Sequence, residues 1–391
     1  MINDQIVGNQ DNATVIQENS KVKRRVEWID IARWIGITLI IISHTIMYEN
    51  WYYFQNVLFM VHVPIFFFLS GYLYHNKTWR KRLSGILSTL ILPYLVVGFI
   101  AIVMAWFVGH IGGFGIFKTP YDTHNAIKAV FLGFGSSQVL FNTNHIEPAI
   151  GAVWFLLGLA WGDFFFAIYL KLALKVKSIW GSVSFWIVLW GLAAGIAIFG
   201  FKLRPHGLLP LSLNAGLVAP LFMIFGYTLK QNGRWFDFTL KWPVSLVCWG
   251  IWLYASRFGT LALSQGAATN IYICTLGAYA GCIAVIKISQ LIETYLPRLS
   301  HVAAYLGQMS MIILCFHLLE MNLSTISARL FAVFTSSNGH LIYDVLMVTG
   351  RLIFCYALAY LIPKIPFVRS FFLVRQYPFK EWFKGNRWQR K

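Results

Sequence analysis

Ten apolar stretches of near-membrane length divide this sequence, and they constrain its fold more than any other feature. About 20 consecutive apolar residues are needed to cross a bilayer as a helix. No β-pattern, internal repeat or soluble domain is apparent. The sequence therefore predicts an all-α polytopic membrane protein of about ten transmembrane helices, at 29–47, 55–74, 86–108, 150–170, 179–200, 208–229, 242–257, 269–286, 301–320 and 341–362. The seventh stretch is short and is the weakest of the ten.

Composition supports this class and argues against others. The chain is 58% hydrophobic and only 12% charged, whereas a soluble domain is about 25% charged. Its net charge of +18 is concentrated in short loops and in the C-terminal tail, which favours a membrane topology over nucleic-acid binding. The five cysteines lie in apolar stretches without CxxC spacing, so we expect buried, inert thiols.

The basic residues predict the orientation, because lysine and arginine accumulate in cytoplasmic loops. With the N-terminus in the cytoplasm, 24 of the 32 lysines and arginines fall in inner segments, 6 in outer segments and 2 within spans. Both termini are then cytoplasmic. We expect a disordered polar tail over 1–25, a transmembrane domain over 26–365 and a basic tail over 366–391. The basic tail is predicted to anchor the chain to the inner leaflet of the membrane.

The first span carries the most informative pair of residues. Arg33 and His44 are eleven positions apart, which on an α-helix is about three turns, so both side chains project from one face roughly 16 Å apart along the axis. Asp30 lies one turn before Arg33, close to the same stripe. Ionisable groups within a membrane helix suggest function. The predicted topology puts Arg33 near the cytoplasmic mouth and His44 near the outer face.

Other ionisable residues fall at similar depths in other spans. His62 lies in the outer half of the second span, and His317 and Glu320 lie near the outer end of the ninth. Three histidines from three spans therefore share roughly one depth. The largest outer loop, about 109–149, contains Glu147 and is long enough to cover a site.

Each of these residues also has a structural explanation. Arg33 could pair with Asp30 or extend to the surface, and each histidine could bond a backbone carbonyl or a neighbouring helix. Arg351 has Asp344 two turns earlier, which suggests an ion pair, and a contact to donor phosphate is the alternative. No span offers an HxxxH pair, so we expect no metal.

Four ordered blocks resemble the acyltransferase-3 family of integral membrane acyltransferases, and within it the fucose 4-O-acetylase-like and polysaccharide O-acetyltransferase members. The first is Arg33-x10-His44 with Asp30 and the PIFFFLSGYL block that follows. The others are AVWFLLGLAWGDFF (152–165), LGQMSMIILCFH (306–317) and RLIFCYALAYLIPKIPFVR (351–369). The resemblance covers about 25–370 in the expected order. We identify no appended extracytoplasmic domain of the SGNH type, so we expect any second catalytic module to be absent or a separate protein.

The resemblance implies transfer of an acyl group, usually acetyl, from cytoplasmic acetyl-CoA to a hydroxyl of an extracytoplasmic glycan. It implies a multi-pass protein of the cell membrane, and a homo-oligomeric state is left open. Histidine can serve such chemistry as base or nucleophile, and phosphates of the donor need cations. We assign as candidates for catalysis His44, Arg33, His62 and His317; for donor binding Arg33, Arg80, Lys81, Arg82 and Arg351; and for substrate contact Asp30, Glu147, Glu320 and Ser310.

Two other functions are compatible with the same intramembrane charges: a transporter or flippase for a lipid-linked glycan, and a non-catalytic sensor or assembly subunit. Within the acyltransferase hypothesis two mechanisms stay open. His44 is a general base in direct transfer, or it forms an acyl-histidine that waits for the acceptor. We favour direct transfer.

Overall fold

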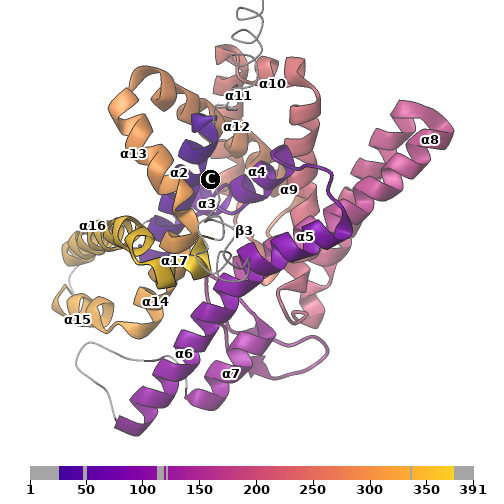
Figure 1. Ribbon diagram of the computed structural model, residues 1–391. Coiled ribbons are helices and arrows are strands. Elements are labelled where there is room, and N and C mark those ends of the chain that lie inside the picture. Colours follow the sequence, from indigo (N-terminus) through magenta and orange to yellow (C-terminus); the bar gives the residue numbers. More distant parts are fainter. Residues whose placement is uncertain (1–25, 47–50, 112–118, 120–121, 335–336, 374–391) are drawn as a thin grey trace, which may run out of the picture.

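Helices make up most of the protein (Figure 1). The computed structural model describes residues 26–46, 51–111, 119, 122–334 and 337–373. The helices are α2 (Glu27–Thr45), α3 (Tyr52–Phe59), α4 (Pro64–Tyr72), α5 (Trp79–Ile86), α6 (Leu92–Ile111), α7 (Thr123–Leu132), α8 (Trp154–Lys202), α9 (Leu213–Gln231), α10 (Gly233–Thr239), α11 (Trp242–Ala255), α12 (Ile271–Tyr295), α13 (Pro297–Gln308), α14 (Ser310–Leu323), α15 (Ile326–Val333), α16 (Ser337–Leu361) and α17 (Pro366–Phe372). The tail predicted over 1–25, and the tail from 374 onward, lie outside the described residues.

The few strands are short and lie in connections between helices. β1 (Gln138–Val139) pairs antiparallel with β2 (Ile146–Glu147), and β3 (Leu261–Ala262) pairs antiparallel with β4 (Ala267–Ala268). These two-residue ladders were not anticipated from the sequence, since two residues give no measurable alternation.

Six helical segments of the described chain are long and apolar enough to cross a membrane, or seven if a bent pair counts as one. They are Tyr52–Tyr72, Trp79–His110, Trp154–His206, Leu213–Gln231, Ile271–Tyr295 and Gly339–Lys364, and the bent pair is α13 with α14. The protein is therefore an all-α, multi-pass membrane protein. The number ten and the cytoplasmic location of both termini stay predictions. α2 carries Glu27, Asp30 and Arg33, which lower its hydropathy, and α11 has only 14 residues.

The 49-residue helix α8 contains two of the predicted spans. Its backbone leaves helical geometry at Gly181, where φ is 86°. A positive φ is readily adopted by glycine, which has no Cβ. The helix reverses at its tip (Figure 1), and both limbs pack on α9: Gly162 lies against Ala219 and Gly200 lies against Val218. The two predicted spans 150–170 and 179–200 correspond to these limbs.

Two further helix breaks place site residues at the ends of short helices. Between α3 and α4 the chain turns over 60–63, and Pro64 opens α4, consistent with the missing backbone donor of proline. α13 and α14 meet at an angle of 68° around Met309. His62 lies in the first break, and Ser310 begins the helix after the second.

Glycines allow the central helices to approach closely. A Cβ at Gly71 would lie 1.8 Å from the carbonyl oxygen of Met223, and one at Gly226 would lie 2.1 Å from that of Phe68. α4 and α9 are therefore in backbone contact, as small residues permit in membrane helices. Gly307 of α13 approaches Asp30 of α2 in the same way.

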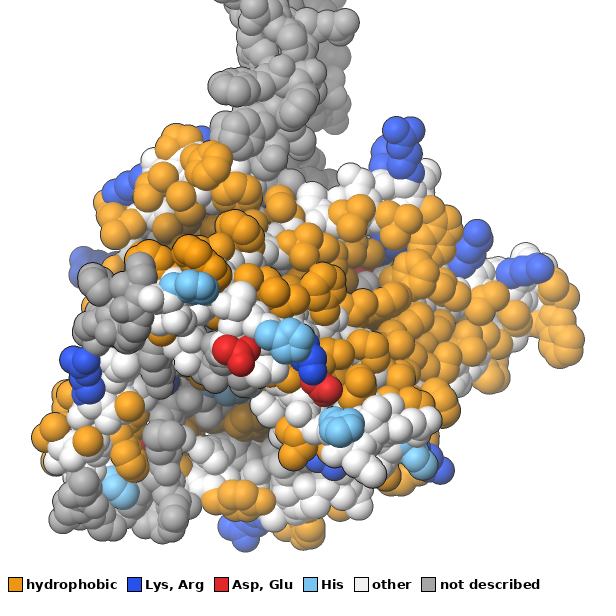
Figure 2. Space-filling view, turned by 90° about the horizontal axis from the view of Figure 1, so that it is seen from below, with side chains coloured by type: hydrophobic (Ala, Val, Ile, Leu, Met, Phe, Trp, Pro, Cys, Tyr) orange, Lys and Arg blue, Asp and Glu red, His pale blue; other side chains and the backbone are white. Residues whose placement is uncertain are grey.

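Apolar side chains cover much of the outer surface of the helices. The space-filling view shows a broad hydrophobic area with lysines and arginines toward its margins (Figure 2). Exposed apolar residues include Trp180 and Ile187 on α8 and Phe99 and Trp106 on α6. Contiguous apolar surface of this kind is typical of contact with lipid. α17, within the predicted C-terminal tail, instead buries Phe372 against the helical core.

Candidate active site

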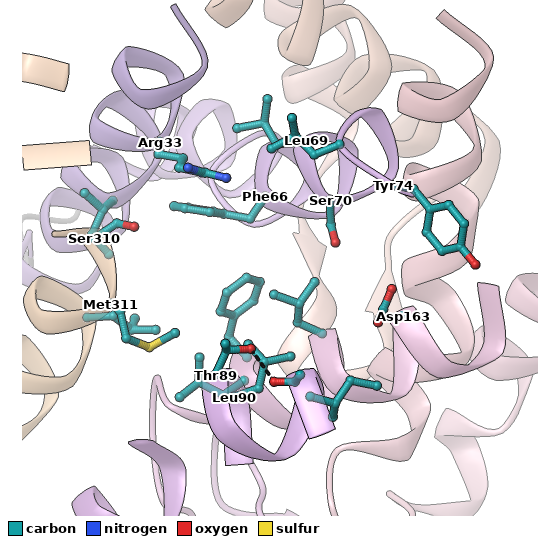
Figure 3. Close-up of a pocket in the computed structure, with 18 of the residues that line it drawn as sticks. Arg33, Phe66, Leu69, Ser70, Tyr74, Thr89, Leu90, Asp163, Ser310 and Met311 are labelled. Atoms are coloured by element: carbon teal, nitrogen blue, oxygen red, sulfur yellow. Dashed lines mark hydrogen bonds between the residues drawn. The ribbon is translucent and has the colours of Figure 1, made fainter. Parts of the chain in front are cut away.

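A cavity with a volume of about 460 Å³ lies between α2, α4, α5, α8 and α14. Figure 3 shows Arg33, Ser70, Asp163 and Ser310 around this opening. We call it the donor cavity, after the donor-binding role that the sequence predicts for Arg33 and Arg82. Its lining combines apolar side chains with the basic side chains of Arg33, Lys77 and Arg82. Such a lining suits a ligand that has both an apolar part and an anionic group.

Arg33 faces the donor cavity and is held by Asp30. The Arg33 Nη1 atom lies 2.8 Å from Asp30 Oδ1, and the arginine side chain is 29% exposed whereas that of Asp30 is 2% exposed. A carboxylate one turn away therefore orients the guanidinium. The pairing that the sequence left as an alternative is present, and it occurs together with a cavity-facing position.

A second, much smaller cavity of about 20 Å³ adjoins the donor cavity and is lined by His44 and His62. We call it the histidine cavity. Along α2, Arg33, Ile37 and Ile40 line the donor cavity, and Ile40 and His44 line the histidine cavity. The four residues follow one another at intervals of three or four, so one helical face runs through both cavities. The shared face predicted for Arg33 and His44 is confirmed.

The three predicted histidines meet at this point. The ring centre of His44 lies 6.2 Å from that of His62 and 6.4 Å from that of His317. His62 Nδ1 lies 2.8 Å from the carbonyl oxygen of Leu58. A carbonyl can only accept, so Nδ1 carries the proton and Nε2 of a neutral His62 keeps its lone pair. Neither ring nitrogen of the buried His317 has a hydrogen-bond partner among the described residues.

Arg351 lies beside the histidines and not in the donor cavity. Its Nε atom is 2.8 Å from Glu320 Oε2, and both side chains are largely buried, at 7% and 12% exposed. The contact is a charge contact without the alignment of a hydrogen bond. Arg351 Nη1 also donates to Thr45 Oγ1 at 3.0 Å. The ion pair expected with Asp344 is therefore corrected: the partner of Arg351 is Glu320, on a different helix.

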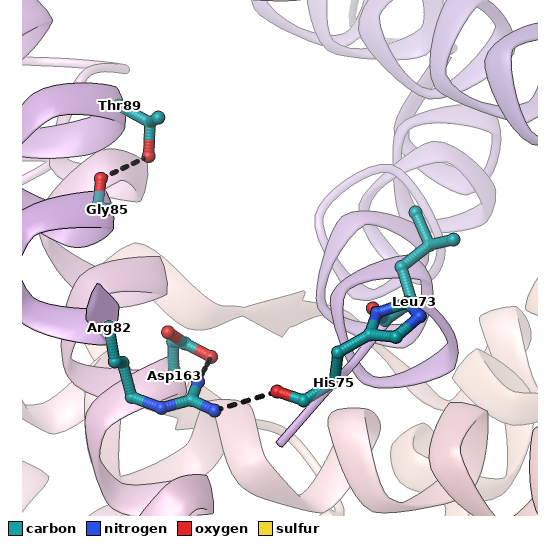
Figure 4. Close-up of polar contacts among 6 residues, drawn as sticks. All are labelled: Leu73, His75, Arg82, Gly85, Thr89 and Asp163. Carbon is teal, nitrogen blue, oxygen red and sulfur yellow. Dashed lines mark hydrogen bonds and ion pairs between the residues drawn. The ribbon is translucent and has the colours of Figure 1, made fainter. Parts of the chain in front are cut away.

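Arg82 lines the donor cavity, and Figure 4 shows its polar contacts. Its guanidinium donates to Asp163 Oδ1 at 2.7 Å and to the carbonyl oxygen of His75 at 3.1 Å. It also lies over the ring of Tyr74, 4.3 Å from its centre, a cation–π contact. Arg82 thereby joins α5 to α8 and to the segment after α4 while lining the cavity.

One comparison assigns the family. The family model described as Acyltransferase domain matches residues 26–360. The chain belongs to the acyltransferase-3 family. No curated protein and no solved structure matches it. This acyltransferase-3 protein is therefore a membrane acyltransferase, and the resemblance seen in the ordered sequence blocks is confirmed.

The fold of this acyltransferase-3 protein does not bring every predicted site residue to a cavity. Ser310 lines the donor cavity, but Arg80 and Lys81 are exposed on α5 and line neither cavity. Glu147 lies in β2 and pairs with Lys128 at 3.5 Å. Among the described residues no group of three His, Cys, Asp or Glu side chains is arranged to hold a metal ion. The individual roles assigned from the sequence stay predictions.

Sequence reasoning missed the apolar lining of the acyltransferase-3 site. Tyr74 under Arg82, and Phe155 and Leu314 between the two cavities, were not singled out. Apolar side chains carry no chemical signature in a single sequence. The signal available for Leu314 was its position one turn before His317, which places both on one side of α14.

Proposed function

We propose that this acyltransferase moves an acetyl group from cytoplasmic acetyl-CoA to a hydroxyl of an extracytoplasmic glycan. The observation that carries the proposal is the single face of α2 that presents Arg33 to the donor cavity and His44 to the histidine cavity. One helix then connects a site for anionic groups with a site for proton transfer. Acetyl-CoA requires such a separation, because its phosphates and its thioester lie at opposite ends of an extended arm.

The donor cavity suits the body of acetyl-CoA. Its volume of about 460 Å³ falls within the ~300–1,000 Å³ of small-molecule sites. Arg33, Lys77 and Arg82 supply positive charge for phosphates, and arginine binds them through paired N–H donors. The extended arm of the donor then follows the α2 face toward His44, over a distance of roughly 16 Å along the axis.

The histidines supply the proton transfers. In direct transfer, a neutral imidazole removes the proton of the acceptor hydroxyl as its oxygen attacks the thioester carbonyl. The carbonyl carbon–sulfur bond breaks, the ester carbon–oxygen bond forms, and the proton passes from imidazolium to the departing CoA thiolate. In the alternative route the acyl group first bonds to a His44 ring nitrogen and then to the acceptor, with the same net balance. We favour direct transfer, with His44 as base and His62 and His317 beside it.

The proposed sides of the membrane follow from the distribution of basic residues. Arg33 lies toward the N-terminal end of α2, where the chain is proposed to enter the membrane, and His44 lies toward the C-terminal end of the same helix. A cytoplasmic donor and an outer glycan therefore approach from opposite faces of the cell membrane. No nucleic-acid partner is proposed.

Replacing His44 tests the proposal. His44→Ala in membranes supplied with acetyl-labelled acetyl-CoA and base-deacylated cell-envelope polysaccharide is expected to lower glycan labelling by at least ~10²-fold, the contribution typical of a general base. The matched control is His301→Ala, because His301 is exposed on α13 and lines neither cavity. Labelling by the wild type also separates this function from a flippase, which transfers no acetyl group. A fully active His44→Ala protein contradicts the proposal.

A further inference from the structure

The donor cavity and the histidine cavity share a wall of three apolar side chains. Ile40, Phe155 and Leu314 line both cavities, and they come from three different helices, α2, α8 and α14. All three are buried, with 3% to 5% of their surfaces exposed. The direct path from the donor cavity to His44 therefore lies between these side chains. We call these three residues the throat.

The throat lies one helical turn from the histidines. Ile40 precedes His44 by four residues on α2, and Leu314 precedes His317 by three residues on α14. One turn of an α-helix rises about 5.4 Å. A thioester sulfur lying between the throat residues therefore has its carbonyl carbon close to the imidazoles, and only the remainder of the acyl chain extends into the histidine cavity.

The wall has little freedom to widen. The Phe155 ring lies 5.4 Å from the ring of Phe66 and 5.5 Å from that of Phe67, measured between centres, and Trp154 lies 6.3 Å away. Closely packed aromatic side chains resist displacement because protein interiors are packed like crystals. Phe155 is therefore a fixed side of the throat, and Ile40 and Leu314 are its aliphatic sides.

The space beyond the throat is of the size of one small group. About 20 Å³ is available in the histidine cavity, and holding a single water needs ~10–15 Å³ on the same measure. A methyl group is of similar size. Each additional methylene has to displace packed side chains such as Phe59 and Val63, which line the same cavity.

We propose that Ile40, Phe155 and Leu314, together with the histidine cavity, form an acyl-size filter that admits a two-carbon acyl group and rejects longer ones. The filter rests on the proposed function, because it acts on the acyl end of a thioester donor. Discrimination by an apolar pocket is about 10–200-fold per methylene. Acetyl is therefore expected to exceed butyryl, two methylenes longer, by at least ~100-fold in kcat/KM.

The filter is tested with acetyl-, propionyl- and butyryl-CoA, each labelled in the acyl group, and base-deacylated cell-envelope polysaccharide as acceptor. Leu314→Ala enlarges the histidine cavity and is expected to lower the acetyl-to-butyryl ratio of kcat/KM by ~10-fold or more. Leu156→Ala is the matched control, because Leu156 is equally buried but lines only the donor cavity. Its ratio is expected to equal that of the wild type. Ile40→Val removes one methyl group and provides a milder variant, with a few-fold decrease, if Leu314→Ala does not fold.

The possible results separate the two ideas. A wild type that transfers none of the acyl groups refutes the proposed function, and the filter with it. A wild type that transfers acetyl and butyryl equally, or Leu314→Ala and Leu156→Ala proteins with the same ratio, refutes the filter and leaves the proposed function standing.

Discussion

Glu320→Gln removes one charge of the most buried ion pair near the histidines, and its effect can be worked from the structure. At the 2.8 Å between Glu320 Oε2 and Arg351 Nε, two unit charges attract by about 6 kcal/mol at an effective dielectric constant of ~20. Desolvation offsets part of this attraction. Removing one partner of a buried pair nevertheless costs ~3–5 kcal/mol, because the other charge stays buried and uncompensated.

The free energy of unfolding in detergent measures this cost. We expect Glu320→Gln to lower it by ~3 kcal/mol or more. Glu147→Gln is the matched control for stability: Glu147 meets Lys128 at 3.5 Å, and that lysine side chain is 44% exposed. A surface pair of this kind contributes only ~0–1 kcal/mol. Equal destabilisation by the two substitutions would refute the idea that Glu320 compensates a buried charge.

A double variant separates stability from positioning. Glu320→Gln with Arg351→Met removes both charges and is expected to recover most of the lost stability. The rate of acyl transfer is expected to stay at least ~10-fold below that of the wild type, equivalent to ~1.4 kcal/mol. The reason is that the double variant lacks the hydrogen bond from Arg351 to Thr45, the residue next to His44. Full recovery of transfer contradicts a positioning role for Arg351.

Two further predictions concern helix contact and donor binding. Gly71→Ala is expected to lower the free energy of unfolding by at least the ~1–3 kcal/mol typical of overpacking, because the added Cβ meets the Met223 carbonyl. Gly250→Ala is the control, because the space around Gly250 is open. Comparable thermal stability of the two variants would contradict the close contact between α4 and α9. Arg82→Lys keeps a positive charge opposite Asp163 but loses the second N–H group, which donates to the His75 carbonyl. Steady-state kinetics should then show the KM for acetyl-CoA raised several-fold with little change in kcat. An unchanged KM excludes Arg82 from acetyl-CoA binding.

Spacing within one helix was the most predictive feature of the sequence. The eleven residues from Arg33 to His44 fix a common face, because helix geometry alone decides it. The meeting of His44 with His62 and His317 was anticipated from depth, since consecutive spans alternate in direction. The family then follows from ordered blocks along the chain.

Contacts between helices could not be predicted in the same way. Arg351 was expected to pair with Asp344 on its own helix, but it pairs with Glu320 because α16 packs against α14. The throat depends on how Phe155 of α8 meets side chains of two other helices, and a single sequence does not specify those crossings. The number of spans stayed open for a related reason. Charged residues lower the hydropathy of α2, and α8 combines two predicted spans in one element that bends at Gly181.

The measurement that tests the account most directly is the sidedness of acyl transfer. Sealed inside-out vesicles from producing cells carry the cytoplasmic face outward and the cell-envelope glycan inside. With acetyl-labelled acetyl-CoA added outside, the account predicts label on the enclosed glycan for the wild type and for His301→Ala, and none for His44→Ala. Label that appears only when donor and glycan are on the same side of the membrane would contradict a passage along the α2 face.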